Sequence, residues 1–294
     1  MLYKYVRPER LDIIKGLEVR FTPANALNDP FELRPRFEAL VAEADLLANL
    51  SSTPIDFDPI LRQAYGMLAP EQRALLPFED AAGAFRSFME TDQGRSAVSE
   101  GLSWFLGFNV DAAVHLRESL YEALNRGVGI LSLSEIPDDP LMWAHYGDSH
   151  RGFVIGFNEK HSFFCRRRSE NDEFYFLRKV VYADLPPATS ILGVEGNSLF
   201  ITKGTKWSYE REWRMLAPLE DSSRSIEVGG ESVQLFAVPP EILKSVVFGA
   251  RASAELECSV RDALGTNANL SHVLLSRATL DMDSQQVQVR SCAR

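Results

Sequence analysis

Two short stretches of the sequence concentrate side chains that could do chemistry. The first contains a loop between two apolar strands, which we expect at 129–133 and 152–157. It holds an acidic turn between Pro137 and Pro140, and its chemically capable side chains are Ser134, Trp143, His145, Tyr146, His150 and Arg151. Loops that gather large polar aromatic side chains between rigid strands are often binding sites. We therefore predict that this loop forms the floor of a pocket.

The second stretch, residues 203–216, combines acidic, basic and aromatic side chains. If the chain is a β-strand from residue 210 onward, Glu210, Glu212 and Arg214 share one face, because side chains alternate along a strand. An exposed ion pair between Arg214 and Glu212, worth about 0–1 kcal/mol, is the simplest structural interpretation. However, the stretch also carries Trp207, Tyr209 and Trp213. So many aromatic rings favour partly buried carboxylates, which are candidates for shifted pKa values and for chemistry.

A third candidate is the turn 25–32, in which Asn28 and Asp29 precede Pro30. Asn and Asp side chains bond nearby backbone groups and proline presets φ, so turn formation alone can account for both residues. The alternative is that Asn28 and Asp29 face the same pocket as the other two stretches. The sequence leaves these two interpretations equally open.

The elements that must position these residues are rich in strands. Apolar or alternating runs predict strands at 2–6, 17–22, 129–133, 152–157, 178–182, 212–217, 234–238 and 245–249, with 270–276 and 285–290 closing the sheet. Helical signals cover 8–15, part of 190–204, and 252–264. The glycines of the strand 152–157 should let another backbone come close.

Residues 37–126 have a different, helical texture. Apolar residues recur there at helical spacing, and the helix breakers between them are Pro54, Pro59, Pro70, Pro77 and Gly94. The pattern predicts about five short helices without a catalytic motif. The expected organisation is an α+β core domain, residues 1–36 and 127–294, interrupted by an α-helical insertion, residues 37–126.

The composition narrows the class of protein. A content of 45% hydrophobic and 24% charged residues is typical of a globular protein, and a net charge of −10 argues against broad electrostatic binding to nucleic acid. No apolar run approaches the roughly 20 residues needed to span a bilayer, and the first ten residues lack the apolar centre of a signal peptide. The three cysteines form neither a disulfide framework nor a zinc pattern. We expect a cytoplasmic protein without membrane contact or bound metal; the oligomeric state stays open.

Several blocks of the sequence together resemble an uncharacterised bacterial group, the domain-of-unknown-function family 2971. The matching blocks are Leu2-Tyr3-Lys4-Tyr5, Leu27-Asn28-Asp29-Pro30-Phe31-Glu32, Ser134, Met142-Trp143-Ala144-His145-Tyr146, His150-Arg151-Gly152, Val181-Tyr182, Lys206-Trp207 and Tyr209-Glu210-Arg211-Glu212-Trp213-Arg214. They span the chain from its start to Arg214 except for the helical insertion. This resemblance supplies no activity by itself.

The order of the motifs also resembles that of ADP-ribosyltransferases, particularly the DNA-modifying type found in bacterial toxin systems. Such enzymes open with a strand, a helix and a second strand, and carry a Pro-Met-aromatic loop similar to Pro140-Leu141-Met142-Trp143. They place a catalytic Glu at the start of an apolar strand, as Glu212 stands here, before a Val-Pro turn similar to Val238-Pro239. The chain departs from them at the first motif, where Tyr3, Lys4 and Tyr5 replace the usual His or Arg.

The second resemblance implies a fold and a reaction. The fold would be a mixed, mostly antiparallel split sheet of the ADP-ribosyltransferase-like type. The substrate would be NAD, the acceptor a nucleic acid or a protein, and the setting a toxin–antitoxin system or phage defence. Loss of nicotinamide leaves an oxocarbenium-like ribose, which needs a carboxylate to stabilise its charge and to bond a ribose hydroxyl.

The resemblance then assigns roles to the candidate residues. Glu212 would be the catalytic carboxylate, Glu210 a second acid, and Tyr146 or Trp143 would stack on the nicotinamide ring. His145, His150, Arg151 and Arg214 would contact phosphate or hold the carboxylate, and the further contacts to NAD would come from Tyr5, Asn28, Asp29 and Ser134. The interpretation makes a spatial prediction, namely that Tyr146 and Glu212 line one cavity although they are far apart in the sequence.

Two other classes of function stay open. A non-catalytic module, such as an antitoxin or a sensor, could keep the same fold and a pocket for a small ligand or nucleotide. A metal-dependent nuclease could use Asp29, Glu32, Glu210 and Glu212, although no His/Asp spacing in the sequence singles out a metal.

Overall fold

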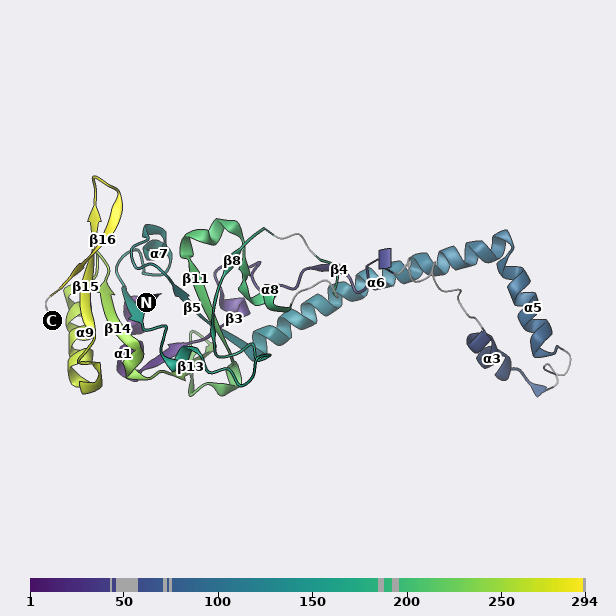
Figure 1. Ribbon diagram of the computed structural model, residues 1–294, viewed down its shortest axis with the longest axis horizontal. Coiled ribbons are helices and arrows are strands. Elements are labelled where there is room, and N and C mark those ends of the chain that lie inside the picture. The colour runs from purple at the N-terminus through teal and green to yellow at the C-terminus, as the bar shows by residue number, and fades with distance from the viewer. Residues whose placement is uncertain are drawn as a thin grey trace. The chain divides into compact units, whose positions relative to one another are not determined.

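The chain folds into two compact units, which we describe separately. The computed structural model describes residues 1–42, 44–45, 58–70, 73, 76–184, 188–191 and 196–292. The first unit holds Met1–Pro35, Ser119–Pro186 and Glu195–Arg294, and the second holds Arg36–Glu118 and Pro187–Val194. Figure 1 labels the main elements of both units.

The first unit is built on a nine-stranded, largely antiparallel open sheet. In spatial order its strands are β16 (Gln286–Ser291), β15 (Leu274–Asp281), β14 (Leu243–Phe248), β6 (Phe153–Phe157), β1 (Leu2–Val6), β5 (Val128–Ser134), β11 (Glu212–Pro218) and β7 (Leu177–Lys179), and β3 (Thr22–Pro23) also pairs with β5. Only β14 and β15 run parallel to each other in this sheet. The mixed, mostly antiparallel sheet expected from the sequence is confirmed.

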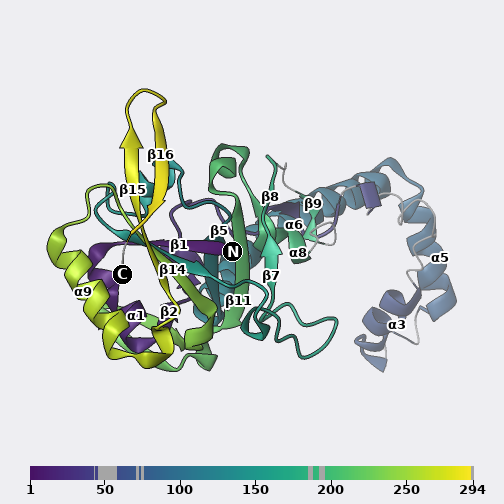
Figure 2. The same cartoon turned by 60° about the vertical axis from the view of Figure 1, so that its left-hand side comes forward.

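The two faces of this sheet carry different cores. On one face pack α1 (Asp12–Gly16) and α9 (Ala254–Thr266), which contribute Ile13, Ile14 and Val260, all fully buried. Figure 2 shows α1 and α9 side by side, and the β15–β16 hairpin extending beyond the sheet. On the other face a smaller core forms around α7 (Pro140–His145), with Met142 and Trp143 at its centre.

Local sequence explains where these helices begin. The Asp139 side chain accepts the backbone N–H groups of Leu141 and Met142 at 2.8 and 2.9 Å, and Pro140 occupies the first position of α7, where its missing N–H costs nothing. The Ser253 hydroxyl caps α9 in the same way, accepting from Leu256 at 3.2 Å. Such caps fix the start of a short helix to within one residue.

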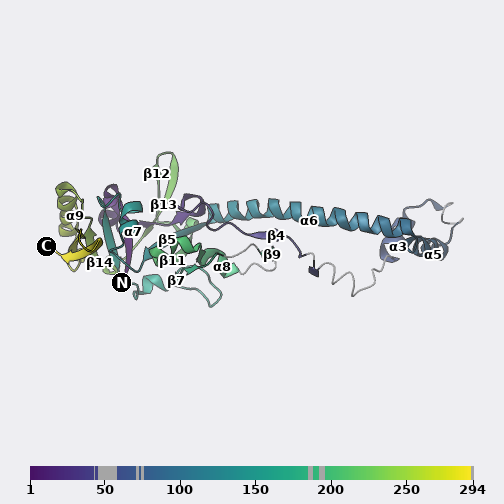
Figure 3. The ribbon, with the colours of Figure 1, turned by 90° about the horizontal axis from the view of Figure 1, so that it is seen from above.

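A three-stranded sheet flanks the main one. Its order is β12 (Arg224–Val228), β13 (Glu231–Ala237) and β2 (Glu18–Arg20), and Figure 3 shows the β12–β13 hairpin projecting from the unit. The hairpin turn consists of Gly229 and Gly230, whose φ angles of 62° and 84° favour glycine. Three smaller elements also belong to the first unit: β10 (Thr202–Lys203) pairs in parallel with β8 (Val181–Tyr182), and α8 spans Gly196–Ile201.

The second unit is mainly helical. Its helices are α3 (Asp58–Gly66), α5 (Phe78–Met89) and most of α6 (Asp92–Gly127), and β4 (Phe37–Ala39) pairs with β9 (Ala188–Ser190). The buried Asn109 of α6 fixes the chain after β4: its Oδ1 accepts from Leu40 and Val41 at 3.0 Å, and its Nδ2 donates to Val41 O at 2.8 Å.

The prediction of short helices is wrong for α6, which is 36 residues long. Gly94 was expected to separate two helices, but it lies in the first turn of α6, where its N–H donates to the Thr91 hydroxyl at 3.1 Å. Pro59 likewise lies in the first turn of α3, where proline is tolerated. Apolar residues also recur at helical spacing over 40–50, but most of that stretch falls outside the described residues, as does Pro54.

Three predicted strands differ from the structure. The segment 17–22 divides into β2 and β3, and 178–182 into β7 and β8, because each half pairs with a different sheet. The strand predicted over 270–276 is β15, which begins only at Leu274, since Ala268–Leu270 forms a 3₁₀ helix. β12 had no clear sequence signal, and its residues are mostly exposed. Among the described residues no helix is both long and apolar enough to cross a bilayer.

The feature that positions the site is a gap in the pairing of β5. On one side β5 pairs with β11 along its whole length. On the other side β1 meets it at Ser134, opposite Tyr3, and β3 meets it at Ile130 and Gly129. The edge of β5 at Ser132 therefore lies between two pairing partners without a strand beside it. The cavity described below opens there.

Gly152 provides a test of the register that holds this sheet together. A Cβ atom at Gly152 would lie 2.1 Å from Val6 O and 3.2 Å from the Arg7 Cα, and both of these atoms belong to the backbone of β1 and its end. We expect Gly152→Ala to lower the free energy of unfolding by about 1–3 kcal/mol through overpacking, measured by chemical denaturation. Gly265→Ala, where a Cβ meets open space near the end of α9, is the control and should be neutral or stabilising. Equal effects would contradict the close approach.

Candidate functional site

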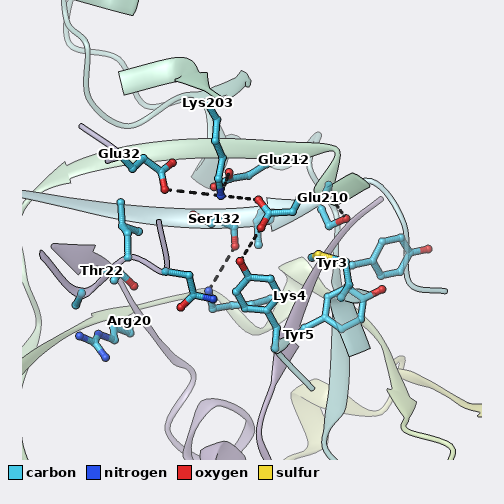
Figure 4. A pocket seen from close by; sticks show the side chains of 17 residues that line it. Tyr3, Lys4, Tyr5, Arg20, Thr22, Glu32, Ser132, Lys203, Glu210 and Glu212 are labelled. Carbon is cyan, nitrogen blue, oxygen red and sulfur yellow. Dashed lines mark hydrogen bonds and ion pairs between the residues drawn. The ribbon is translucent and has the colours of Figure 1, made fainter. Parts of the chain in front are cut away.

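A cavity of about 210 Å³ opens at the gap beside Ser132. Its walls come from β1, β2, β3, β5, β10 and β11, from the turn after β3 and from α7. The charged side chains that line it are Lys4, Arg20, Glu32, Lys203, Glu210 and Glu212. Figure 4 shows Glu32, Lys203, Glu210 and Glu212 on one side of Ser132, and Lys4 and Arg20 on the other. The cavity thus has a carboxylate-rich end and a basic end.

The carboxylate-rich end is organised around the ammonium group of Lys203. Its Nζ lies 2.6 Å from Glu210 Oε2, 3.5 Å from Glu212 Oε2 and 3.7 Å from Glu32 Oε2. All four side chains are at most 6% exposed. Burial lowers the pKa of Lys203, but the charges of Glu212 and Glu210 outweigh it and raise the net value, so the group is a cation.

Arg214 forms a second layer behind these carboxylates. Its Nε and Nη2 bond the two oxygens of Glu212 at 2.9 Å each, a bidentate pair that fixes the carboxylate plane. Its guanidinium also pairs with Glu32, and its Nη1 donates to Phe200 O at 2.9 Å. Burial lowers the pKa of Arg214, opposed by the charge of Asp29, yet a guanidinium stays protonated. Arg214 does not line the cavity; it holds Glu212 and Glu32 in place.

The charges in this network do not balance. Three buried carboxylates, Glu32, Glu210 and Glu212, face two buried cations, Lys203 and Arg214. Burial first, and then the charge of Glu210, raise the pKa of Glu212 to about 7, while Lys203 opposes the rise. A proton therefore belongs to the network below neutral pH, since it removes the one uncompensated negative charge.

Glu210 reaches the cavity by a different route from the one predicted. It ends a 3₁₀ helix, Thr205–Glu210, rather than lying on the strand, and β11 begins at Glu212. Between them Arg211 has a φ of 45°, which turns the chain so that both carboxylates face the cavity. The Ser134 hydroxyl donates to Glu210 O at 2.7 Å and fixes this turn. The predicted shared face of Glu212 and Arg214 on β11 is confirmed.

Tyr146, the residue that follows α7, contacts the carboxylate-rich end. Its hydroxyl donates to Glu210 Oε1 at 2.6 Å, so Glu210 lies between the phenol and the Lys203 ammonium. Burial, followed by the charge of Glu210, raises the pKa of Tyr146, and a hydrogen bond with the Asn28 side chain lowers it in part. Tyr146 and Glu212 both line this cavity, which confirms the spatial prediction.

A second tyrosine braces Glu212 from outside the wall. The Tyr182 hydroxyl, from β8, accepts the backbone N–H of Glu212 at 2.7 Å. Burial raises the pKa of Tyr182 to about 12, so the phenol keeps its proton. The first residue of β11 is thus held through its backbone by Tyr182 and through its side chain by Arg214.

Of the predicted contact residues, Tyr5, Asn28 and Ser134 line the cavity. Asp29 does not: its Oδ1 accepts the N–H of Phe31 at 2.9 Å, so it forms the turn that the simpler interpretation gave it. Of the two interpretations that the sequence left open, Asn28 therefore fits the one that faces the pocket and Asp29 the one that forms the turn.

Four residues of the 143–151 block are not at the cavity wall. Trp143 is fully buried, donates to Pro137 O at 2.9 Å and packs edge-on against Tyr5, so it cannot stack on a ligand. The His150 ring stacks on Trp143, and burial lowers its pKa. His145 is exposed beside Tyr146, and Arg151 is exposed and pairs with Asp148 at 3.0 Å.

Three charged residues of the cavity, Lys203, Lys4 and Arg20, were not predicted as site residues. Lys203 lies on a two-residue strand, too short for a periodic signal, and its ion pairs reach residues distant in the chain. Lys4 and Arg20 appeared as ordinary strand residues. A charged residue in the middle of the apolar strand 2–6 is the one signal that could have identified Lys4.

The metal-site interpretation meets a physical obstacle. Glu32, Glu210 and Glu212, three of its four proposed ligands, surround the Lys203 ammonium, which occupies the position that a cation would need. Within the described part of the chain, no group of three or more His, Cys, Asp or Glu side chains is arranged to hold a metal ion.

A second cavity, of about 300 Å³, lies between β14, β15 and β16 and shares Tyr3 with the first. Its walls combine apolar side chains such as Val247 and Val273 with serines, and none of its lining side chains is charged. The groups capable of acid–base chemistry therefore concentrate in the first cavity.

Two lysines with equally short ion pairs test how much burial adds to the contribution of an ion pair to stability. Lys203 and Lys179 each lie 2.6 Å from a carboxylate oxygen, but their side chains are 5% and 57% exposed. We expect Lys203→Met to cost about 3–5 kcal/mol in the free energy of unfolding, because it leaves buried carboxylates without their cation. Lys179→Met should cost about 0–1 kcal/mol. Similar losses in urea denaturation would contradict the central role of Lys203.

The raised pKa of Glu212 predicts a pH dependence of stability. The unfolded chain releases this proton near pH 4.5 and the folded protein near 7, so wild-type stability should fall as the pH rises between these values. Glu212→Gln, which mimics the protonated side chain, removes this dependence. Relative to the variant, the wild type should lose on the order of 1–3 kcal/mol between pH 5 and 8, measured by thermal unfolding.

Glu135→Gln is the control for this measurement. A hydrogen bond from Lys179 lowers the pKa of Glu135, so its contribution to stability is present above its ordinary pKa and is lost only in more acidic solution. The difference between wild type and Glu135→Gln should therefore stay constant from pH 5.5 to 8. Parallel curves for wild type and Glu212→Gln over that range would show that Glu212 holds no proton there.

A family model matches a stretch of the chain that includes part of the carboxylate-rich end. No curated protein and no solved structure matches the chain. The stretch from Met142 to Met215, which contains Tyr146, Lys203, Glu210 and Glu212, matches the family model described as "Protein of unknown function (DUF2971)", residues 142–215.

Proposed function

We propose that the protein is an NAD-using enzyme, an ADP-ribosyltransferase or an NAD glycohydrolase, with the first cavity as its active site. The observation that carries this proposal is the convergence of Glu210, Glu212 and Tyr146 on one cavity wall. The order of motifs that resembles ADP-ribosyltransferases supports the same assignment for Glu212.

The charge of the cavity suits the transition state of such a reaction. Cleavage of the bond between nicotinamide and ribose sends the bonding electron pair to nicotinamide and leaves positive charge on the ribose. The network of Glu32, Glu210 and Glu212 carries one more negative charge than Lys203 and Arg214 neutralise when all three carboxylates are ionised. Preorganised charge of this sign stabilises an oxocarbenium ion.

The two carboxylates have distinct surroundings and therefore distinct roles. Glu212 is fixed bidentately by Arg214, so its position is suited to stabilising the ribose cation and bonding a ribose hydroxyl. Glu210 bonds the Tyr146 hydroxyl and the Lys203 ammonium, which places it in a proton-carrying chain. Glu210 takes the proton when water or an acceptor nucleophile, from a nucleic acid or a protein, attacks the ribose carbon.

Aromatic rings provide the remaining wall for a flat heterocycle. Tyr3, Tyr5 and Tyr146 line the cavity, and Tyr5 is fixed by its hydroxyl, which donates to Ile136 O at 3.0 Å. With Trp143 packed in the core, Tyr146 is the ring that stacks on nicotinamide. Asn28, beside the Tyr146 hydroxyl, offers an amide for hydrogen bonding.

A specific observation also favours a second candidate, a non-catalytic module that binds a nucleotide. Glu212 and Glu210 both have short ion pairs within the protein, with Arg214 and Lys203 respectively. Carboxylates held in this way can serve as a rigid recognition surface without taking part in bond cleavage. The two candidates share the cavity and differ in whether the glycosidic bond breaks.

Nicotinamide release distinguishes them. The protein is incubated with NAD labelled on the nicotinamide or on the adenylate, alone and with DNA, RNA and protein acceptors. We expect release of nicotinamide, and Glu212→Gln should slow it by about 10²–10³-fold, because it removes the charge that stabilises the ribose cation. Glu135→Gln, a carboxylate bonded to Lys179 and Trp213 outside the cavity, should leave the rate unchanged.

The outcomes separate the candidates completely. Nicotinamide release that Glu212→Gln does not slow would remove the catalytic assignment. Absence of release with every acceptor, combined with a thermal shift on adding NAD or ADP-ribose, would establish the binding module. Absence of both release and shift would refute both candidates.

A further inference from the structure

The basic end of the cavity contains two cations without a carboxylate partner. Lys4 of β1 and Arg20 of β2 both line the cavity, and neither takes part in an ion pair among the described residues. Lys203 and Arg214, by contrast, each have at least two carboxylate partners. The unpaired cations face the cavity in a protein whose net charge is −10, so scarcity of acidic residues does not explain them.

The surroundings of Lys4 are unfavourable for an ammonium group. Its Nζ makes one weak hydrogen bond, to Ser132 O at 3.4 Å, across the gap beside β5. Burial first, and then the charge of Arg10, lower its pKa to about 8, and Glu212 opposes the shift only in part. A buried cation without a counter-charge costs stability, and such costs concentrate at functional sites.

Arg20 shows the same feature at a second position. Its Nε atom is buried and has no hydrogen-bond partner among the described residues. Burial lowers the pKa of Arg20, and the charge of Arg10 adds to the effect. Thr22, two residues further along, adds a hydroxyl to the same wall of the cavity. A guanidinium with a free donor, an ammonium and a hydroxyl together match the oxygens of a phosphate group.

We propose that Lys4, Arg20 and Thr22 form an oxyanion subsite that binds the phosphate or diphosphate of the ligand. The anion supplies the counter-charge that the two cations lack in the free protein. In Figure 4 this subsite and the carboxylates lie on opposite sides of Ser132. The ligand therefore carries its phosphate next to a group that is cationic or becomes cationic. Only the identity of that second group rests on the proposed function.

The ligand-free protein gives the first test. Lys4→Met replaces a half-buried cation without an ion pair by an apolar side chain of similar length, so it should raise the thermal midpoint of unfolding. The same variant should weaken binding of inorganic pyrophosphate and of ADP-ribose by about 10- to 100-fold in isothermal titration calorimetry. A binding defect in a variant more stable than the wild type cannot arise from misfolding.

Matched variants define the subsite. Arg20→Gln should weaken both ligands by a similar factor, whereas Arg151→Gln, an exposed arginine paired with Asp148 away from the cavity, should have no effect. Glu212→Gln should keep or tighten pyrophosphate binding, since it removes a negative charge near the subsite. Adenosine, which has no phosphate, should bind Lys4→Met and wild type equally.

The results have distinct meanings for the subsite and for the enzyme. Pyrophosphate binding that depends on Lys4 and Arg20, without nicotinamide release, supports the subsite and refutes the proposed reaction. Nicotinamide release with unchanged pyrophosphate affinity in Lys4→Met and Arg20→Gln refutes the subsite and keeps the reaction. Absence of pyrophosphate binding to the wild type, or equal weakening by Arg151→Gln, also overturns the inference.

Discussion

The arrangement of the candidate site depends on one buried ammonium group. Lys203 lies within 3.7 Å of three carboxylates that come from separate parts of the chain, and without it these carboxylates would repel one another in a medium that screens charge poorly. Burying such a network costs more than an apolar core of equal volume. Its presence at the wall of a cavity, where solvent and ligands can reach it, is consistent with selection for chemistry over stability.

The strand pairing explains why this network lies where it does. β5 pairs continuously with β11, so Ser132 and Ser134 stand opposite Arg214 and Glu212. On its other edge β5 is bridged at its two ends by β1 and β3, and the space between them becomes the cavity. The same gap that opens into the cavity leaves the Ser132 carbonyl without a strand partner, and Lys4 bonds it weakly. One irregularity of pairing thus creates both the carboxylate-rich end and the basic end.

Much of this sheet could be predicted from the sequence, and the reasons are local. Apolar runs located β1, β5, β6 and β11, and alternation placed Glu212 and Arg214 on one face. The glycine at position 152 predicted a close approach of another backbone, which the structure shows at Val6 O. The features that the sequence did not predict depend on distant partners. They are the split of 178–182 between two sheets, the path of Glu210 through a 3₁₀ helix, and the position of Lys203. Periodicity describes one element at a time, so it cannot locate an ion pair between elements.

The two ends of the cavity together restrict the ligand more than either end does. Glu210 and Glu212 weaken the binding of a simple phosphate, and Lys4 and Arg20 weaken that of a simple cation, so neither kind of ion gains from the whole cavity. A molecule with an anionic group beside a centre that becomes positive satisfies both ends at once. In the reaction proposed above, positive charge would develop at that centre only as the glycosidic bond breaks, so the carboxylates would bind the transition state more strongly than the ground state. This difference would be the physical basis of the proposed catalysis.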